Sequence, residues 1–166
     1  DIDACGALFD TLAGSSGKAS FLFTEAQLSG SDDLLRRLCV SGSAIVLSVD
    51  ASSGISRTLS AIERANRTMW TACNAKTRLV FLSGAADATV RAVQEAGYCP
   101  VVFDLDYSAA LPSVSRAASS ILSQARRGGC ATYLGTDSAV QEVWSQLLSR
   151  LRSSGCPISQ LSELST

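Results

Sequence analysis

The chain has 166 residues, 46% of them hydrophobic and 17% charged, which is enough for a folded domain and too apolar for a disordered one. Fourteen basic and fifteen acidic side chains leave a net charge of −1, which argues against a nucleic-acid partner or an anionic membrane surface. No apolar run is long enough to span a membrane. We expect one domain over residues 1–166. Because the chain starts at Asp1 without a Met, we expect either a processed product or a domain excised from a longer chain.

Helix and strand patterns alternate along the first half of the chain. A short helix at residues 8–12 ends at Gly14. There follow a buried strand at 19–23, a helix from 31 to 42, a strand at 44–49, a helix at 55–74 and a strand at 79–82. The long helix carries apolar residues at 3–4 spacing, beginning with Ile55 and Leu59. Trp70 lies in the same helix, where core packing is the expected role of an indole.

The alternation continues through the second half. The expected elements are a helix at 86–96, a strand at 99–105, a helix at 114–125 ended by Gly128, a strand at 130–134, a helix at 138–152 and an extended piece at 157–161. Strands with continuous apolar runs predict a parallel sheet covered on both faces. Right-handed crossovers then allow a closed (β/α) barrel or an open doubly wound sheet, and composition does not separate the two.

The cysteines are spread almost evenly, and none falls in a Cys-x-x-Cys pair, which disfavours a zinc ribbon or a thioredoxin-like motif. They are Cys5, Cys39, Cys73, Cys99, Cys130 and Cys156. A chain of this size does not need disulfides in order to fold, and cysteine packs well as a small apolar residue. We therefore favour buried thiols over disulfides, with room for one or two bridges.

Histidine is absent from the sequence. Histidine is the usual general base near neutral pH and a common metal ligand, so its absence excludes Ser-His-Asp and Cys-His catalysis and nearly all catalytic zinc sites. The glycine-rich phosphate-binding and nucleophile-elbow motifs are absent as well. We expect no catalytic histidine chemistry, no bound metal and no cofactor.

Polar side chains gather where the predicted strands end, which is where parallel α/β folds place their sites. The binding candidates are Glu25, Asp50, Asp104, Asp106, Tyr107 and Asp137. For Asp50 and Asp137 we favour capping of the next helix over a site role. Asp104 and Asp106, two apart on one expected strand, place both carboxylates on one face. For this pair a binding site and a solvated strand end both stay open.

Residues 97–108 read GYCPVVFDLDYS and resemble a late strand of the polysaccharide deacetylases with a NodB homology domain. Further similar segments, in the order of that family, are GKASFLF at 17–23, LLRRL at 34–38, GSAI at 42–45, GCATYLG at 129–135 and QLSEL at 160–164. The resemblance covers almost the whole chain in order and spacing. It implies a deformed (β/α) barrel of about six to seven parallel strands.

The same resemblance implies that the chemistry of the family is lost. That chemistry uses a metal held by an aspartate and two histidines, together with a catalytic aspartate and another histidine. Serines stand in both histidine places of one motif, near Ser48 and Ser52, and the last histidine aligns near Gly135. Only Asp1 and Asp3 are left where the family has its first acidic strand.

The leading hypothesis is a non-catalytic deacetylase-like domain of a secreted or cell-envelope bacterial protein, which binds a glycan or peptidoglycan at the strand ends or serves as a scaffold. A second hypothesis is a carbohydrate-active hydrolase with a carboxylate pair, Asp50 and Asp104, across a cleft. A third is a doubly wound regulatory domain that binds a small ligand where the strand order reverses. A separation of about 5–9 Å across an open cleft would support the second hypothesis, capping bonds that fill both carboxylates would exclude it, and strand order decides the third.

Overall fold

The chain divides into two compact units in this computed structural model, which describes residues 6, 8–10, 12, 19–127, 129–135 and 138–161, with 138–143 described as backbone only. The four-stranded unit comprises residues 20–101 and 160–166. The two-stranded unit comprises residues 1–19 and 102–159. The described residues among 6–12 are helical, as the sequence predicts.

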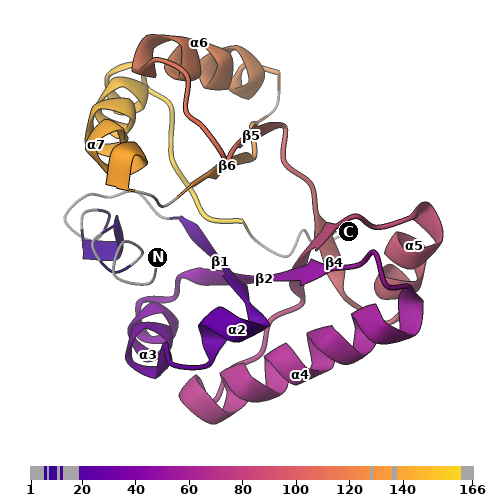
Figure 1. Cartoon of the computed structure of the whole chain (residues 1–166). Coiled ribbons are helices and arrows are strands. Elements are labelled where there is room, and N and C mark those ends of the chain that lie inside the picture. The colour runs from indigo at the N-terminus through magenta and orange to yellow at the C-terminus, as the bar shows by residue number, and fades with distance from the viewer. Residues whose placement is uncertain are drawn as a thin grey trace. The chain divides into compact units, whose positions relative to one another are not determined.

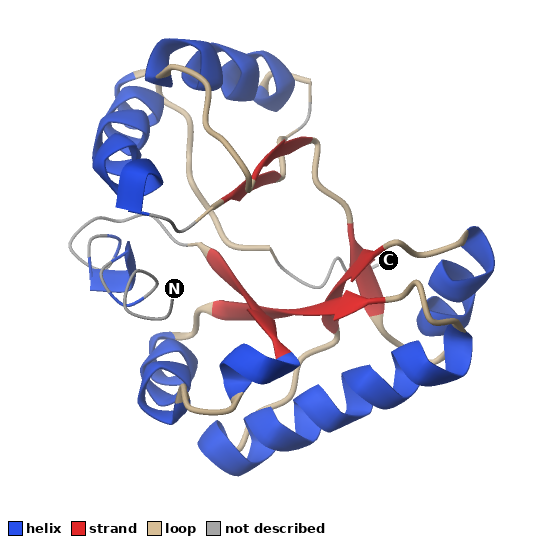
Figure 2. Cartoon of the chain, in the orientation of Figure 1, coloured by secondary structure: helices blue, strands red, loops and turns tan. Residues whose placement is uncertain are grey.

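Four parallel strands form the sheet of the four-stranded unit. They are β1 (Ser20–Thr24), β2 (Ala44–Asp50), β3 (Leu79–Ser83) and β4 (Cys99–Val101), in the order β1-β2-β3-β4. Figure 2 shows these strands side by side. In-register partners share a face of a sheet, and Phe23, Leu47 and Val80, which share one face, are all buried. The predicted strands at 19–23, 44–49 and 79–82 are confirmed.

The helices between these strands lie on one side of the sheet, as Figure 1 shows. They are α2 (Glu25–Leu28), α3 (Asp32–Ser41), α4 (Ile55–Cys73) and α5 (Asp87–Glu95). Consecutive neighbouring strands with right-handed crossovers place every helix on the same face, as in a (β/α) barrel. A doubly wound sheet reverses its strand order, and no reversal occurs among β1–β4. The sheet is open, and its order is that of a barrel segment.

Two details of the helices differ from expectation. The short helix α2 has no counterpart among the predicted elements; Thr24 caps it by accepting from the Gln27 N–H, and the Gln27 side chain accepts from the Thr24 N–H. In the first turn of α4 the predicted apolar stripe is wrong. Ile55 is exposed, and Thr58 is fully buried in its place because its hydroxyl donates to the Gly54 carbonyl.

The two-stranded unit pairs β5 (Leu105–Tyr107) with β6 (Thr132–Leu134) in parallel. Its helices α6 (Val114–Ala125) and α7 (Ser138–Ser153) pack together around a small core. The fully or nearly buried members of that core are Ala117, Ala118, Ile121, Leu147 and Leu151. The helices predicted at 114–125 and 138–152 are confirmed.

The predicted strand at 99–105 is wrong in its second half. Strand β4 ends at Val101, Val102 is 80% exposed, and a new strand begins at Leu105. The backbone N–H groups of Asp104 and Leu105 both donate to the Ala131 carbonyl, so this part of the chain pairs with the segment before β6. The apolar run at 99–105 therefore serves two sheets.

The extended piece expected at 157–161 joins no sheet among the described residues. Its end nevertheless binds the amino-terminal ends of two strands in the four-stranded unit. The Leu161 N–H donates to the Ser20 hydroxyl at 2.7 Å, and the Ala44 N–H donates to the Gln160 side-chain carbonyl at 3.1 Å. The segment thus extends the hydrogen bonding of β1 and β2 without becoming a strand.

Candidate functional site

The carboxyl ends of β1, β2 and β3 bring polar residues to one edge of the four-stranded sheet. Thr24 pairs with Ser48, and Asp50 pairs with Ser83. The turns after β2 and β3 touch, because the Ala51 N–H donates to the Ser83 carbonyl at 2.8 Å. We call this the carboxyl edge. It is the place where the sequence predicts a binding site.

Asp50 is an exposed carboxylate at the carboxyl edge. Its Oδ1 accepts from the Ser52 N–H at 2.9 Å, and Ser52 is its hydrogen-bond partner within the described part of the chain. The hydrogen bond from the Ser52 backbone, followed by that from its side chain, lowers the pKa of Asp50. The favoured capping role is wrong, because α4 begins after Gly54 and has no side-chain cap. Asp50 closes the turn before the helix and faces solvent.

Glu25 is held in an ion pair on the helix face of this unit. Its two carboxylate oxygens accept from Nε and Nη2 of Arg64, at 2.9 and 3.0 Å. This two-point contact raises the pKa of Arg64 through the hydrogen bond and the charge of Glu25. Glu25 therefore links α2 to α4, and a ligand at this carboxylate would have to compete with Arg64.

Asp104, Asp106 and Tyr107 belong to the two-stranded unit. Asp104 precedes β5, and its Oδ2 accepts from the Ala131 N–H at 2.8 Å. Asp106 lies within β5, and its Oδ1 accepts from the Ser108 N–H at 2.8 Å. Tyr107 packs against the core formed by α6 and α7. The expected common strand for the two acids does not form, because the chain changes sheets before Asp104.

Each carboxylate of the hydrolase hypothesis accepts a hydrogen bond from a backbone N–H group. Asp50 closes the turn to Ser52, and Asp104 joins its segment to Ala131. Neither bond caps a helix, so the outcome that would exclude a hydrolytic pair is not observed, and the pair stays a prediction. Asp137 lies outside the described residues, as do Asp1 and Asp3 of the family's first strand.

Gly135 occupies a tight position after β6. A Cβ at this residue would lie 2.5 Å from the carbonyl oxygen of Ser108, which is backbone and cannot rotate away. Any side chain at Gly135 would require the chain at Ser108 to move. Glycine is therefore needed here by the local packing.

Metal-binding clusters are absent from the residues that the structure describes. No group of three cysteine, aspartate or glutamate side chains lies close enough to hold an ion. The sequence supplies no imidazole. Within the same residues, no helix combines the length and the apolar character needed to cross a membrane.

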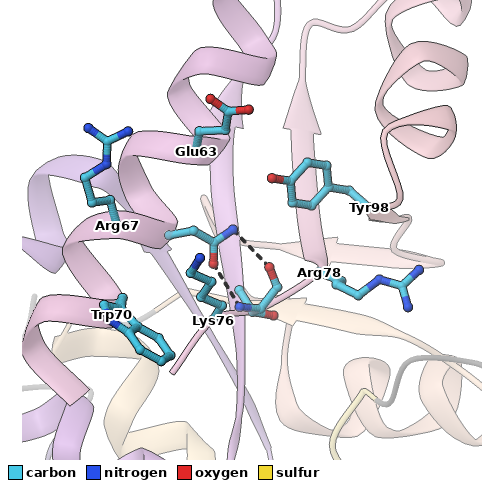
Figure 3. A pocket seen from close by; sticks show the side chains of 8 residues that line it. Glu63, Arg67, Trp70, Lys76, Arg78 and Tyr98 are labelled. Carbon is cyan, nitrogen blue, oxygen red and sulfur yellow. Dashed lines mark hydrogen bonds between the residues drawn. The ribbon is translucent and has the colours of Figure 1, made fainter. Parts of the chain in front are cut away.

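A hollow of about 470 Å³ lies at the opposite, amino-terminal edge of the four-stranded sheet, and Figure 3 shows it from close by. Its lining residues come from α4, from the segment before β3 and from the residue before β4. They are Glu63, Asn66, Arg67, Trp70, Lys76, Thr77, Arg78 and Tyr98. The hollow was not predicted from the sequence, because Trp70 was expected to pack in the core, whereas its side chain is 49% exposed. The missed signal is the density of cationic and aromatic residues around position 70.

Comparison with known proteins identifies the fold. No protein-family model and no curated protein matches the sequence. Among solved structures, the polysaccharide deacetylase Bc1974 from Bacillus cereus matches with a TM-score of 0.78 at 15% identity, over 97% of this chain and 87% of its own. The peptidoglycan deacetylase PdaC from Bacillus subtilis matches with a TM-score of 0.77 at 13% identity, over 99% of this chain and 84% of its own.

A third match is BA3943 from Bacillus anthracis, which is described as a pseudoenzyme of carbohydrate esterase family 4 (CE4). It has a TM-score of 0.72 at 15% identity over 98% of this chain, and the present chain spans 60% of its length. Identities this low show the fold alone. The chain therefore has the NodB-type deacetylase fold that the sequence resemblance implies, and the predicted fold class is confirmed.

Proposed function

We propose that this chain is a degenerate member of the CE4 polysaccharide deacetylase family. The chain itself has no deacetylase activity and binds a glycan at the carboxyl edge. The observation that carries the proposal is the combination of a deacetylase fold with a sequence that contains no histidine. A fold does not fix a function, but a fold without its ligating residues loses the chemistry that depends on them.

The loss of activity follows from the residues near the family's histidine places. Near the first motif stand Ser48 and Ser52, whose hydroxyls are poor ligands for zinc at neutral pH. Near the last place stands Gly135, where the Ser108 backbone leaves no room for a side chain. The packing around Gly135 therefore opposes a histidine at this position. This supports the loss of the whole metal site of the family rather than of single ligands.

Glycan binding is supported by the kind of protein that shares the fold. The matched proteins are described as polysaccharide and peptidoglycan deacetylases. Carboxylates and hydroxyls are common partners of sugar hydroxyls, and Asp50 offers an exposed carboxylate with one local partner among the described residues. We place Asp50 at the centre of the site. Glu25 is kept as a further candidate contact in the same unit, and Asp104, Asp106, Tyr107 and Asp137 stay separate binding predictions.

Two further parts of the proposal concern the whole chain. We propose that residues 1–166 act as one domain, and that the protein is secreted or held in the cell envelope, where glycan polymers are found. A single unfolding transition, seen together by tryptophan fluorescence and circular dichroism, is the result expected for one domain. Two separate transitions would contradict it.

The test of glycan binding is a calorimetric titration with chitotetraose and with soluble peptidoglycan fragments. We expect wild-type protein to bind one of them, and the Asp50→Ala variant to bind it about tenfold more weakly through loss of a charged hydrogen-bond partner. Glu95→Gln, an exposed acid in the last turn of α5, serves as the matched control and should bind as wild type. Absence of binding to both ligands, or equal affinity of Asp50→Ala and wild type, would refute the proposed site.

A further inference from the structure

The hollow at the amino-terminal edge has a rigid floor. Asn66, which is buried, donates from Nδ2 to the Thr77 carbonyl at 3.0 Å and accepts from the Thr77 N–H at 2.9 Å. The Thr77 hydroxyl donates to the Ile45 carbonyl at 2.7 Å. Nε of Arg78 donates to the Gly97 carbonyl at 2.6 Å. These bonds fix the segment before β3 to α4, β2 and the loop before β4, so the hollow is preformed.

The walls of the hollow carry uncompensated positive charge. Arg67 and Lys76 line it and form no ion pair with any residue that the structure describes. The acidic member of the lining is Glu63, one helical turn before Arg67. This local excess of positive charge on a chain of net charge −1 favours an anionic ligand that carries few charges.

An exposed indole lies beside these cations. Trp70 is 49% exposed, and Nζ of Lys76 lies 5.5 Å from the centroid of its ring. Figure 3 shows Tyr98 across the hollow from α4, with its phenol directed toward the helix. The hollow thus offers an apolar ring surface, three cationic residues (Arg67, Lys76 and Arg78) and hydroxyl-binding groups within about the volume that small-ligand sites occupy.

We propose that this hollow binds a saccharide that carries a carboxylate group. The apolar C–H face of the sugar ring lies on Trp70, the carboxylate lies between Lys76 and Arg67, and Tyr98 with Glu63 receives the ring hydroxyls. A nucleic acid fits less well, because its regular phosphate charges would meet Glu63 and a chain that is acidic overall. The site is separate from the carboxyl edge and does not depend on the function proposed for that edge.

Trp70 provides the signal for the test. Trp144 is the other tryptophan of the chain, so a Trp144→Phe background leaves Trp70 as the single indole. We expect saturable fluorescence change with tetragalacturonate and none with its methyl ester, and an affinity for the acid that falls as salt rises. A short single-stranded DNA of similar charge should bind more weakly than the acidic sugar. Calorimetry on Trp70→Ala then measures the contribution of the ring itself.

Charge variants test the rest of the site. Arg67→Ala with Lys76→Ala should weaken binding of the acid tenfold or more, as expected for loss of two charged contacts. Arg57→Ala is the matched control, because it removes an exposed arginine from the same helix about 15 Å away along the axis. No response up to about 10 mM acid, equal affinity for the ester, or tighter binding of DNA would overturn the proposal.

Different variants test the carboxyl edge and the hollow, so one proposal can be refuted without the other. Asp50→Ala should leave tetragalacturonate binding unchanged, and the Arg67 and Lys76 variants should leave chitotetraose or peptidoglycan binding at the carboxyl edge unchanged. If one variant abolished both, the two sites would not be independent, and the assignment of the hollow would be wrong.

A second, independent observation concerns two cysteines in the four-stranded unit. Sγ of Cys39, in the last turn of α3, lies 3.0 Å from Sγ of Cys73, the last residue of α4. The helices are tied at this end, because Nε of Arg36 donates to the Ala72 carbonyl at 3.0 Å. Two thiols held this close by helix packing need little movement to bond.

We infer that Cys39 and Cys73 form a disulfide when a disulfide oxidant, such as oxidised glutathione, is present. The two thiols lose two protons and two electrons as their S–S bond forms, and the S–S bond of the oxidant is reduced to two thiols. Burial, together with the neighbouring Cys73, raises the pKa of the Cys39 thiol to about 12, so Cys39 stays protonated while the pair is reduced. An oxidising compartment such as the cell envelope would favour the bonded form.

Peptide mapping without reductant tests this pairing. We expect a linked peptide that contains Cys39 and Cys73 and is lighter by two hydrogens, while Cys99, Cys130 and Cys156 are alkylated. Dithiothreitol should lower the Tm of wild type, because the bond closes a long loop, and should leave the Tm of the Cys39→Ser, Cys73→Ser double variant unchanged. Alkylation of both Cys39 and Cys73 after treatment with oxidised glutathione, or a link to another cysteine, would refute it.

Discussion

The two units of the chain build their cores in different ways. In the four-stranded unit the sheet and the helices build the core together, with Leu47 of β2, Val80 of β3 and Leu35 of α3 fully excluded from solvent. In the two-stranded unit each strand has three residues, none of them buried, and the core lies between α6 and α7. Strands and helices therefore share the core of the first unit, whereas in the second unit the buried residues belong to helices and the strands are only partly buried.

The largest expected effects come from cavities in the two cores. Leu47→Ala removes a fully buried side chain between sheet and helices and should cost about 3–5 kcal/mol of unfolding free energy. Leu151→Ala lies in a core whose neighbours, such as Ile158, are only partly buried and can relax, so about 2–3 kcal/mol is expected. Urea denaturation measures both changes in unfolding free energy. An equal or larger cost for Leu151→Ala would contradict the expected difference between the two cores.

A smaller effect is expected at the buried amide before β3. Asn66→Ala removes both hydrogen bonds to the Thr77 backbone and leaves those groups without their partner, at a cost of about 2–3 kcal/mol. Thr71→Ala on the same helix is the control. Its hydroxyl is exposed and bonds only within α4, so a change below about 0.5 kcal/mol is expected. A neutral Asn66→Ala would show that this contact is not needed.

The corresponding contact of the two-stranded unit is exposed and should matter less. Asp104→Ala removes the acceptor for the Ala131 N–H before β6 and should cost about 1 kcal/mol. Asp104→Asn keeps an acceptor oxygen and should retain most of the stability. Hydrogen exchange at Ala131 reports the contact directly, and unchanged protection in Asp104→Ala would contradict the role assigned to this carboxylate.

The smallest effect is expected at the exposed ion pair between Glu25 and Arg64. Both side chains reach solvent, so Arg64→Gln should lower the Tm only slightly at low salt. Screening should shrink the difference from wild type as salt rises. A difference that persists in high salt would mean that Arg64 contributes through packing of its stem rather than through charge.

Much of the fold was predictable from the sequence, because its strongest signals are local. The run Ile45-Val46-Leu47 predicts a buried strand, and it lies at the centre of the sheet. The break between β4 and β5 was not predictable, because the apolar run at 99–105 has no local stop. Its division depends on the contacts of Asp104 and Leu105 with Ala131, which lies far along the chain.

The candidate site was less predictable for the same reason. The sequence places Asp50 at a strand end correctly, but the local bond to Ser52 rather than a helix cap depends on where α4 begins. Trp70 was expected to pack in the core from its residue type, since an indole on a helix usually packs inward. Its exposure follows from the position of Lys76 and from the hollow before β3, both of which are tertiary features.

The proposed function requires that a deacetylase fold persists in this chain without deacetylase chemistry. The most direct measurement is acetate release from chitin and peptidoglycan oligomers in the presence of added zinc, with Bc1974 as the active reference. We expect no release above the protein-free rate, and no tight binding of zinc by calorimetry. Zinc-dependent acetate release that a chelator abolishes would contradict the claim, because it would require a metal site built without histidine.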